Sequence, residues 1–220
     1  VVHHPGEPLA ARLDVGDKDV GGAAARVVRG FHAPDGGVEL ETFRRKKCGI
    51  RIADAPLEYD LVVAGGGIAG TVTALAAARL GLKSILLQDK SVPGGCNSSE
   101  IRVPLGGCTH IGKYPNIGNT VREIAPICLM PGAKAPEYYE DTRKINAFHA
   151  DCAGKAELRL NERVVSIETD PAEPSRITAV ITRHTVTGKE TRYRGRLFSD
   201  CTGDGFVALA AGAKYMYGTE

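Results

Sequence analysis

The fold is decided by residues 59–70, which read YDLVVAGGGIAG. The first six residues are mostly apolar and rich in valine, which is typical of a strand buried on both faces of a parallel sheet. Three glycines follow in G-x-G-x-x-G spacing, and residues 71–80 are dominated by Ala, Leu and Val, which favour a helix. Gly81 stands where a helix ends, and LKSILL at 82–87 predicts a second buried strand. This stretch therefore predicts a β-turn-α-β crossover within a parallel sheet.

The spacing of the glycines predicts a diphosphate site at the start of the crossover helix. Gly65 permits a tight turn, Gly67 lets the backbone approach a pyrophosphate, and Gly70 lets the helix pack on the strand. Backbone amides at the start of the helix, at Ile68 and Ala69, would then face the phosphates. A Walker-type phosphate loop is excluded, since no Gly-Lys-Ser/Thr follows the glycines.

The ribose position departs from the simple dinucleotide pattern. An acid about 20 residues after the glycines would bind a ribose diol, but the second strand ends in Gln88 and Asp89. Either Gln88 hydrogen-bonds the hydroxyls, more weakly than a carboxylate would, or Asp89 reaches them from a shifted turn.

Composition excludes several classes of protein. With 43% hydrophobic and 25% charged residues the chain is not disordered, and no apolar run is long enough to span a membrane. A net charge of +2, 5% aromatic residues and no Trp argue against a nucleic-acid partner. None of the six cysteines forms a C-x-x-C pair, so no metal site is expected. No signal peptide is visible, which favours a cytoplasmic location but leaves the compartment open.

The rest of the chain is predicted to hold two parts. Residues 1–55 are expected to form an N-terminal antiparallel β appendage, or the end of a preceding domain, with a strand over 38–43. Residues 56–220 are expected to form the nucleotide-binding domain, with a long loop over 91–136 and a helix over 138–153. Later patterns predict strands over 156–160, 163–168, 177–184, 190–194 and 197–200, and a closing helix over 206–213.

Four segments resemble the FAD-dependent oxidoreductases of the two-dinucleotide-binding-domain type: residues 61–70, 87–99, 161–165 and 198–205. The resemblance implies a Rossmann-like FAD-binding fold with a parallel sheet and an inserted β-meander. It places the cofactor against several further residues: Gly94, Gly95 and Ser98 in a loop, Val164 at the adenine, and Thr202, Gly203 and Asp204 in a second phosphate-side turn. In the family a later segment of a longer chain closes over the flavin, so the fold is expected to be incomplete at the C-terminus.

The resemblance also implies an activity. FAD would accept a hydride from an unidentified small polar substrate, and an electron acceptor not encoded here would reoxidise the flavin. Arg102 would offset the negative charge of reduced flavin or hold a substrate carboxylate, and His110 would move a proton. Two alternatives stay open: an NAD(P)-dependent dehydrogenase, and a non-catalytic nucleotide-binding subunit or fragment that needs a partner chain or a missing C-terminal part.

Overall fold

The computed structural model describes residues 34–105, 113, 119–124, 141–150, 155–214 and 216. The chain divides into two compact units, one formed by residues 1–51 with 216–220 and the other by residues 52–215. Within the described residues no helix is long and apolar enough to cross a membrane. The boundary expected at residue 56 between two domains stays a prediction.

In the first unit the strand predicted over 38–43 is wrong, because the helix α2 spans Pro34–Cys48. The segment is rich in the helix formers Glu, Leu, Arg and Lys. The side chains of Glu41 and Arg44, one turn apart, form an ion pair at 3.0 Å, which supports the helix. Gly49, with a φ of 61°, lies just beyond its end. An apolar-polar alternation over six residues was therefore outweighed by helix propensity.

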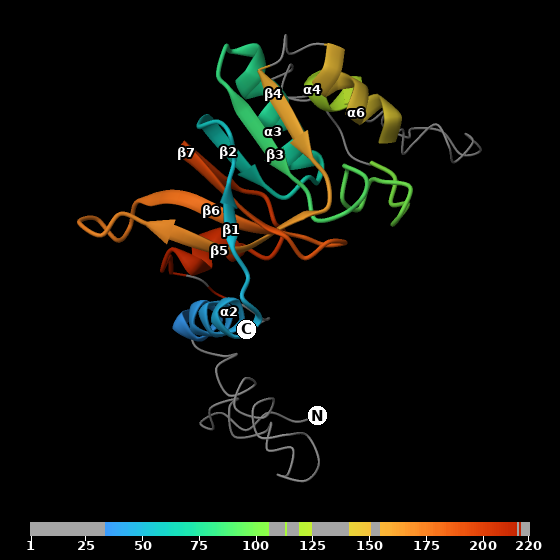
Figure 1. Cartoon of the computed structure of the whole chain (residues 1–220). Helices are drawn as coiled ribbons and strands as arrows, with labels where there is room; N and C mark the ends of the chain where they lie inside the picture. The colour runs from blue at the N-terminus through green and yellow to red at the C-terminus, as the bar shows by residue number, and fades with distance from the viewer. Residues whose placement is uncertain are drawn as a thin grey trace. The chain divides into compact units, whose positions relative to one another are not determined.

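The second unit is built on a parallel sheet with the strand order β4-β3-β2-β7. These strands span Ala156–Arg159 (β4), Ser84–Leu87 (β3), Tyr59–Ala64 (β2) and Glu190–Asp200 (β7). The helix α3, Ile68–Arg79, connects β2 to β3, so the predicted crossover is confirmed. Gly81 has a φ of 93°, a conformation that suits glycine just after a helix. Figure 1 shows this sheet with α3 packed against it.

A β-meander continues from the same sheet through β7. The strands β5, Glu162–Thr169, and β6, Ile177–His184, pair antiparallel with each other, and β6 pairs antiparallel with β7. The whole forms a seven-stranded sheet in which β1, Ile52–Asp54, pairs parallel with β7. The predicted α/β class with a mostly parallel sheet and a meander is confirmed.

The strand β7 belongs to both halves of the sheet. Its residues 190–194 pair with β6, and its residues 195–200 pair with β2, so the two strands predicted over 190–194 and 197–200 are one. Gly195 stands where the break was expected. A Cβ there would lie 2.7 Å from Val62 Cγ2, so this glycine allows a close approach of two strands. The part of β7 over 197–200 is not buried throughout, because Leu197 is 61% exposed.

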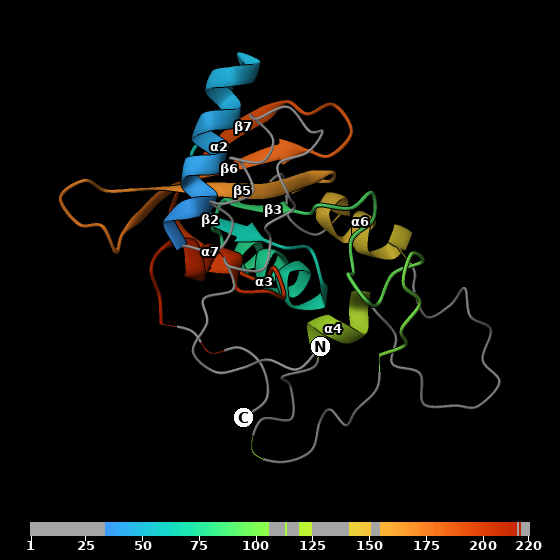
Figure 2. The same ribbon diagram turned by 90° about the horizontal axis from the view of Figure 1, so that it is seen from below.

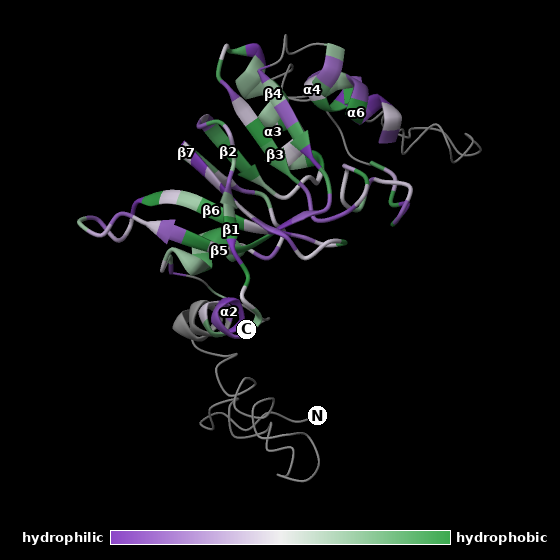
Figure 3. Ribbon diagram, viewed as in Figure 1, coloured by the Kyte–Doolittle hydropathy of each residue, from purple (hydrophilic) through white to green (hydrophobic). Residues whose placement is uncertain are grey.

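Two apolar cores cover the two faces of the parallel strands. Figure 2 shows α3 on one side of β2 and β3 and the meander strands β5 and β6 on the other. One packs α3 with the helices α4, Asn119–Ile124, and α6, Asp141–Ala150. Its buried residues include Leu75, Leu86 and Phe148. The other packs the meander and the short helix α7, Phe206–Ala210, around Val62, Ile85 and other apolar residues. Figure 3 shows hydrophobic residues along β2 and β3 and also on the meander strands β5 and β6. The helix predicted over 138–153 is present over its described residues 141–150, and the one predicted over 206–213 spans Phe206–Ala210.

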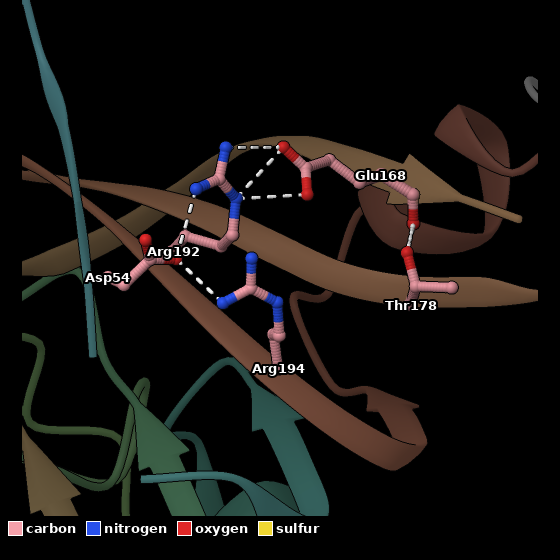
Figure 4. A network of polar contacts seen from close by, with 5 residues as sticks. All are labelled: Asp54, Glu168, Thr178, Arg192 and Arg194. Atoms are coloured by element: carbon pink, nitrogen blue, oxygen red, sulfur yellow. Dashed lines mark hydrogen bonds and ion pairs between the residues drawn. The ribbon is translucent and has the colours of Figure 1, made fainter. Parts of the chain in front are cut away.

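A polar network ties β1 to the meander (Figure 4). The guanidinium of Arg192, on β7, donates to both carboxylate oxygens of Glu168 on β5 at 2.9–3.0 Å and to Asp54 Oδ1 on β1 at 3.0 Å. Arg194 donates to the same Asp54 oxygen at 2.8 Å. Hydrogen bonds from Arg192 lower the pKa of the Asp54 carboxyl, and Arg194 adds to this effect. The side chains therefore join β1 and β7 to β5, which does not pair with either strand through its backbone.

Candidate functional site

The first glycine turn is held tightly where β2 passes into α3. A Cβ on Gly65 would lie 2.3 Å from the carbonyl oxygen of Cys201, and Gly65 has a φ of 96°. A Cβ on Gly70 would lie 1.9 Å from the carbonyl oxygen of Gly65. These two glycines therefore let the turn, the helix and the end of β7 pack backbone against backbone.

Gly67 differs from its neighbours because the space beside it is open. A Cβ built on Gly67 meets no described atom within 4 Å, and its φ of −63° is accessible to any residue. α3 begins at Ile68, and its first turn holds no acidic residue and receives no side-chain cap. The first amides of a helix lack intrahelical acceptors and carry the positive end of the dipole. The turn therefore offers hydrogen-bond donors toward an open space, an arrangement that suits a phosphate group.

The predicted second loop lies directly against this turn. Gly94 N–H donates to the carbonyl of Gly66 at 2.7 Å, and Gly67 and Gly94 form an isolated parallel bridge. A Cβ on Gly95 would lie 3.1 Å from Gly67 Cα. Ser98, which is fully buried, donates its hydroxyl proton to the carbonyl of Gly95 at 2.7 Å. The structure thus brings Gly94, Gly95 and Ser98 together with the first turn.

The two candidates for the ribose position have different surroundings. Gln88 is only 3% exposed. Its Oε1 accepts a hydrogen bond from Gly66 N–H at 2.9 Å, and its Nε2 donates to the carbonyl of Val92 at 3.0 Å. Asp89, the next residue, is exposed. The amide of Gln88 is therefore engaged by backbone groups, whereas the carboxylate of Asp89 faces solvent.

The predicted second turn, at the end of β7, is organised by Asp200. One oxygen of this carboxylate accepts from the N–H of Thr202 at 3.0 Å and from its hydroxyl at 2.7 Å, and the other accepts from Ala208 N–H at 2.9 Å. Partial burial would raise the pKa of Asp200, but these hydrogen bonds outweigh it and lower the pKa. Gly203, which has a φ of 85°, and Asp204 follow Thr202 in the chain and are exposed.

Asp200 is a site residue that the sequence analysis missed. A short polar side chain two residues before an amide that it accepts is the pattern of an Asx-turn, and Asp200 before Thr202 fits it. The contact between Gly65 and the carbonyl of Cys201 brings this second turn beside the first. Three carboxyl ends of parallel strands, those of β2, β3 and β7, therefore meet at one place.

Val164 lies on the neighbouring strand β5. It is 8% exposed and belongs to the core between the sheet and the meander. β5 begins beside the end of β3, because Glu162 N–H donates to the carbonyl of Gln88 at 2.8 Å. The backbone of Val164 is thus two residues from the edge where β3 ends.

A second residue that the sequence analysis missed is Lys144. Its side chain is fully buried on α6, and its Cε lies 2.9 Å from the position of a Cβ on Gly94. On the same helix, Asp141 accepts from the backbone N–H of Ser99 at 3.1 Å and from its hydroxyl. α6 therefore supports the loop that carries Gly94 and Gly95. A lysine within a helix carries no sequence signal for such a role.

The predicted catalytic residues are only partly described. Arg102 is exposed at a φ of 63°, and its Nε donates to the carbonyl of Ser99 at 3.0 Å. Arg102 follows Ser98 on the loop that carries Gly94 and Gly95. His110 lies outside the described residues. The roles given to these two residues stay predictions.

The chain is similar to known flavin-dependent oxidoreductases. The model of the family described as FAD dependent oxidoreductase matches residues 60–220. A curated relative, the tRNA uridine 5-carboxymethylaminomethyl modification enzyme of Roseiflexus castenholzii, is 32% identical over 125 residues, which are 53% of this chain and 17% of that enzyme. The chain thus spans less than a fifth of this relative.

Two solved structures of lower identity align with part of this chain. A geranylgeranyl bacteriochlorophyll reductase-like protein of Thermoplasma acidophilum aligns at a TM-score of 0.48 and 15% identity, covering 74% of this chain and 43% of that one. The THI4 protein of Thermovibrio ammonificans aligns at a TM-score of 0.48 and 16% identity, covering 80% and 69%.

Proposed function

The chain belongs to the FAD-dependent oxidoreductase family, whose cofactor is FAD, and from this premise we propose that the carboxyl ends of β2, β3 and β7 hold the ADP part of FAD. Because the chain covers only part of its relatives, the activity of the whole protein is part of this proposal. The comparisons support no NAD(P)-dependent alternative.

The open space beside Gly67 is the observation that carries the proposal. Gly65 and Gly70 are packed against the backbone, so their lack of side chains is explained by the fold alone. Gly67 has an ordinary φ and free space around its Cβ direction, so the fold itself does not require glycine there. A diphosphate that approaches the backbone at this point would require it. The backbone N–H groups of residues 68 and 69 would donate hydrogen bonds to the phosphate oxygens.

The surrounding residues suit the other parts of the cofactor. We assign the ribose diol to Asp89, because the amide of Gln88 is already hydrogen-bonded inside the protein. The backbone at Val164, beside the end of β3, would contact the adenine. Gly203 and Asp204, exposed on the turn that Asp200 supports, would face the second phosphate and the adjoining chain of the cofactor.

The proposed reaction is oxidation of a small polar substrate. FAD, when bound, supplies a flavin ring that accepts a hydride. Arg102 would bind a substrate carboxylate or stabilise negative charge, since it is an exposed cation on the loop that follows Ser98. His110 would accept or deliver a proton. An external electron acceptor would complete the cycle.

Cofactor binding by the purified chain tests this proposal. We expect the protein to retain a flavin with its visible absorption spectrum and to release FAD on denaturation. The fluorescence of FAD should be quenched when it binds to the FAD-free protein. NADH or NADPH at the same concentrations should not compete with FAD for binding. Protein that binds either nicotinamide cofactor and never FAD would refute the proposal.

A further inference from the structure

We propose that Gln88 is a positioning residue that locks the two glycine loops of the FAD site together through both ends of its amide, and that it does not contact the ribose. The inference rests on the proposed function, since the site that it organises is the one assigned to FAD. Its basis is a set of contacts between the end of β3 and the two loops.

The contacts of Gln88 form a closed ring. Its Oε1 holds the N–H of Gly66, in the first loop, and its Nε2 holds the carbonyl of Val92, at the start of the second. The second loop then returns to the first, because Gly94 N–H donates to the carbonyl of Gly66. Both polar groups of the Gly66 backbone are therefore bound, one by Gln88 and one by Gly94. This fixes Gly66 immediately before Gly67, whose backbone faces the diphosphate.

The packing around Gln88 leaves it no freedom to turn outward. The side chain is 3% exposed. A Cβ on Gly66 would lie 2.7 Å from Gln88 Cβ and 3.0 Å from its Cγ and Cδ, so the glutamine occupies the space that a side chain at residue 66 would take. Rotation toward the ribose would leave a buried N–H and a carbonyl without partners, which costs more than a ribose hydrogen bond returns.

The chemistry of the ring requires an amide. One end of the side chain must accept a hydrogen bond from Gly66 N–H and the other must donate one to the carbonyl of Val92, and only Asn or Gln does both at every pH. A glutamate at this position would direct a carboxylate oxygen at the carbonyl of Val92. It could donate there only when protonated. The lock thus explains why glutamine stands where the simple dinucleotide pattern has an acid.

The variant Gln88→Glu makes a sharp test, because the new carboxyl can donate a hydrogen bond to the carbonyl of Val92 only when it is protonated. Burial beside a carbonyl raises the pKa of the new carboxyl above the ordinary value of about 4.3. A group with a raised pKa in the folded state contributes stability that is lost as the pH rises through that pKa. The variant is compared with wild type, with Gln88→Met and with Asn146→Asp. The last of these adds the same charge at an exposed position of α6.

Charged groups near residue 88 are common to all four proteins. They are Asp89 and Lys90 along the chain, and Arg159 and Glu162 on the neighbouring strands, whose backbones hydrogen-bond to that of residue 88. The difference between the pH curves of Gln88→Glu and wild type therefore reports on residue 88 alone.

Two measurements are made between about pH 5 and pH 8: the Kd for FAD, and the Tm of the FAD-free protein. For Gln88→Glu we expect FAD binding close to wild type at the acid end and about tenfold weaker at the alkaline end, with a parallel fall in Tm. Gln88→Met should bind FAD about tenfold more weakly at every pH, and Asn146→Asp should follow wild type.

Two results would overturn the proposal. Tighter FAD binding by Gln88→Glu than by wild type at pH 8 would mean that residue 88 contacts the ribose. An identical pH dependence of Tm in FAD-free Gln88→Glu and wild type would mean that no lock exists. The Tm measurement needs no FAD, so failure of the lock is distinguished from failure of the proposed function, in which wild type itself would not bind FAD.

Discussion

Replacement of Gly67 by valine separates a structural glycine from a cofactor glycine. The φ of −63° and ψ of −178° at this residue lie in a region that valine occupies without strain. No described atom stands within 4 Å of the new Cβ. We therefore expect the free energy of unfolding of the FAD-free protein to change by no more than about 0.5 kcal/mol.

Binding of FAD should respond quite differently. The valine side chain would occupy the space where the diphosphate meets the backbone amides of Ile68 and Ala69. A hydrogen bond to a charged group contributes roughly 1.5–3 kcal/mol, so loss of two costs about 3 kcal/mol or more. That corresponds to an increase in Kd of more than 100-fold.

Gly70→Val is the matched control in the same motif. Its Cβ would lie 1.9 Å from the carbonyl oxygen of Gly65, so the helix must move and we expect a loss of about 3 kcal/mol of stability. Thermal unfolding of the FAD-free variants and flavin fluorescence titration give the two quantities. Wild-type FAD affinity in a folded Gly67→Val protein would refute the assignment of the diphosphate to this turn.

Three further predictions concern the groups that support the site and the sheet. Asp200→Asn should flatten the acid limb of the Tm curve, because a carboxyl with a lowered pKa contributes stability above its ordinary value of 3.8 that is lost as the pH falls through the folded pKa. Burial raises the pKa of Tyr193 to about 12, with a further contribution from Glu162. Its phenol should thus stay protonated near pH 11 in a spectrophotometric titration, and Tyr193→Phe should remove one late step. Arg192→Met should lower the free energy of unfolding by about 1–2 kcal/mol in urea, whereas Arg176→Met, whose exposed ion pair is 3.9 Å long, should cost less than about 0.5 kcal/mol.

The crossover and its site could be predicted from the sequence because local pattern and tertiary requirement agree there. Residues 61–64 are buried or nearly so between two cores, so an apolar run was the correct signal. At Gly65 and Gly70 the backbone contacts explain why only glycine fits. The pairing of Gly67 with Gly94 could be expected only from a resemblance, since nothing local connects two loops 27 positions apart.

Other features depend on contacts that a one-dimensional pattern does not contain. Two strands were predicted over 190–194 and 197–200, but Gly195 lies within one strand, and its lack of a side chain serves the approach of Val62 from β2. The position of Gln88 was predicted, whereas the direction of its amide depends on the Gly66 N–H, 22 positions away. In residues 38–43 the apolar and polar residues predicted a strand, but the high helix propensity of the segment determined its structure.

The shared strand β7 has a consequence for synthesis of the chain. Asp60, in β2, and Arg196, in β7, form an ion pair at 3.1 Å although they lie 136 positions apart. At translation rates of about 5–20 residues per second, β2 would leave the ribosome roughly 7–27 s before its partner. During this interval the nascent chain presents an apolar strand with an open edge, which invites pairing with other chains. Chaperone contact with the nascent protein should therefore be greatest before residues 195–200 emerge, and should end when β7 closes the edge.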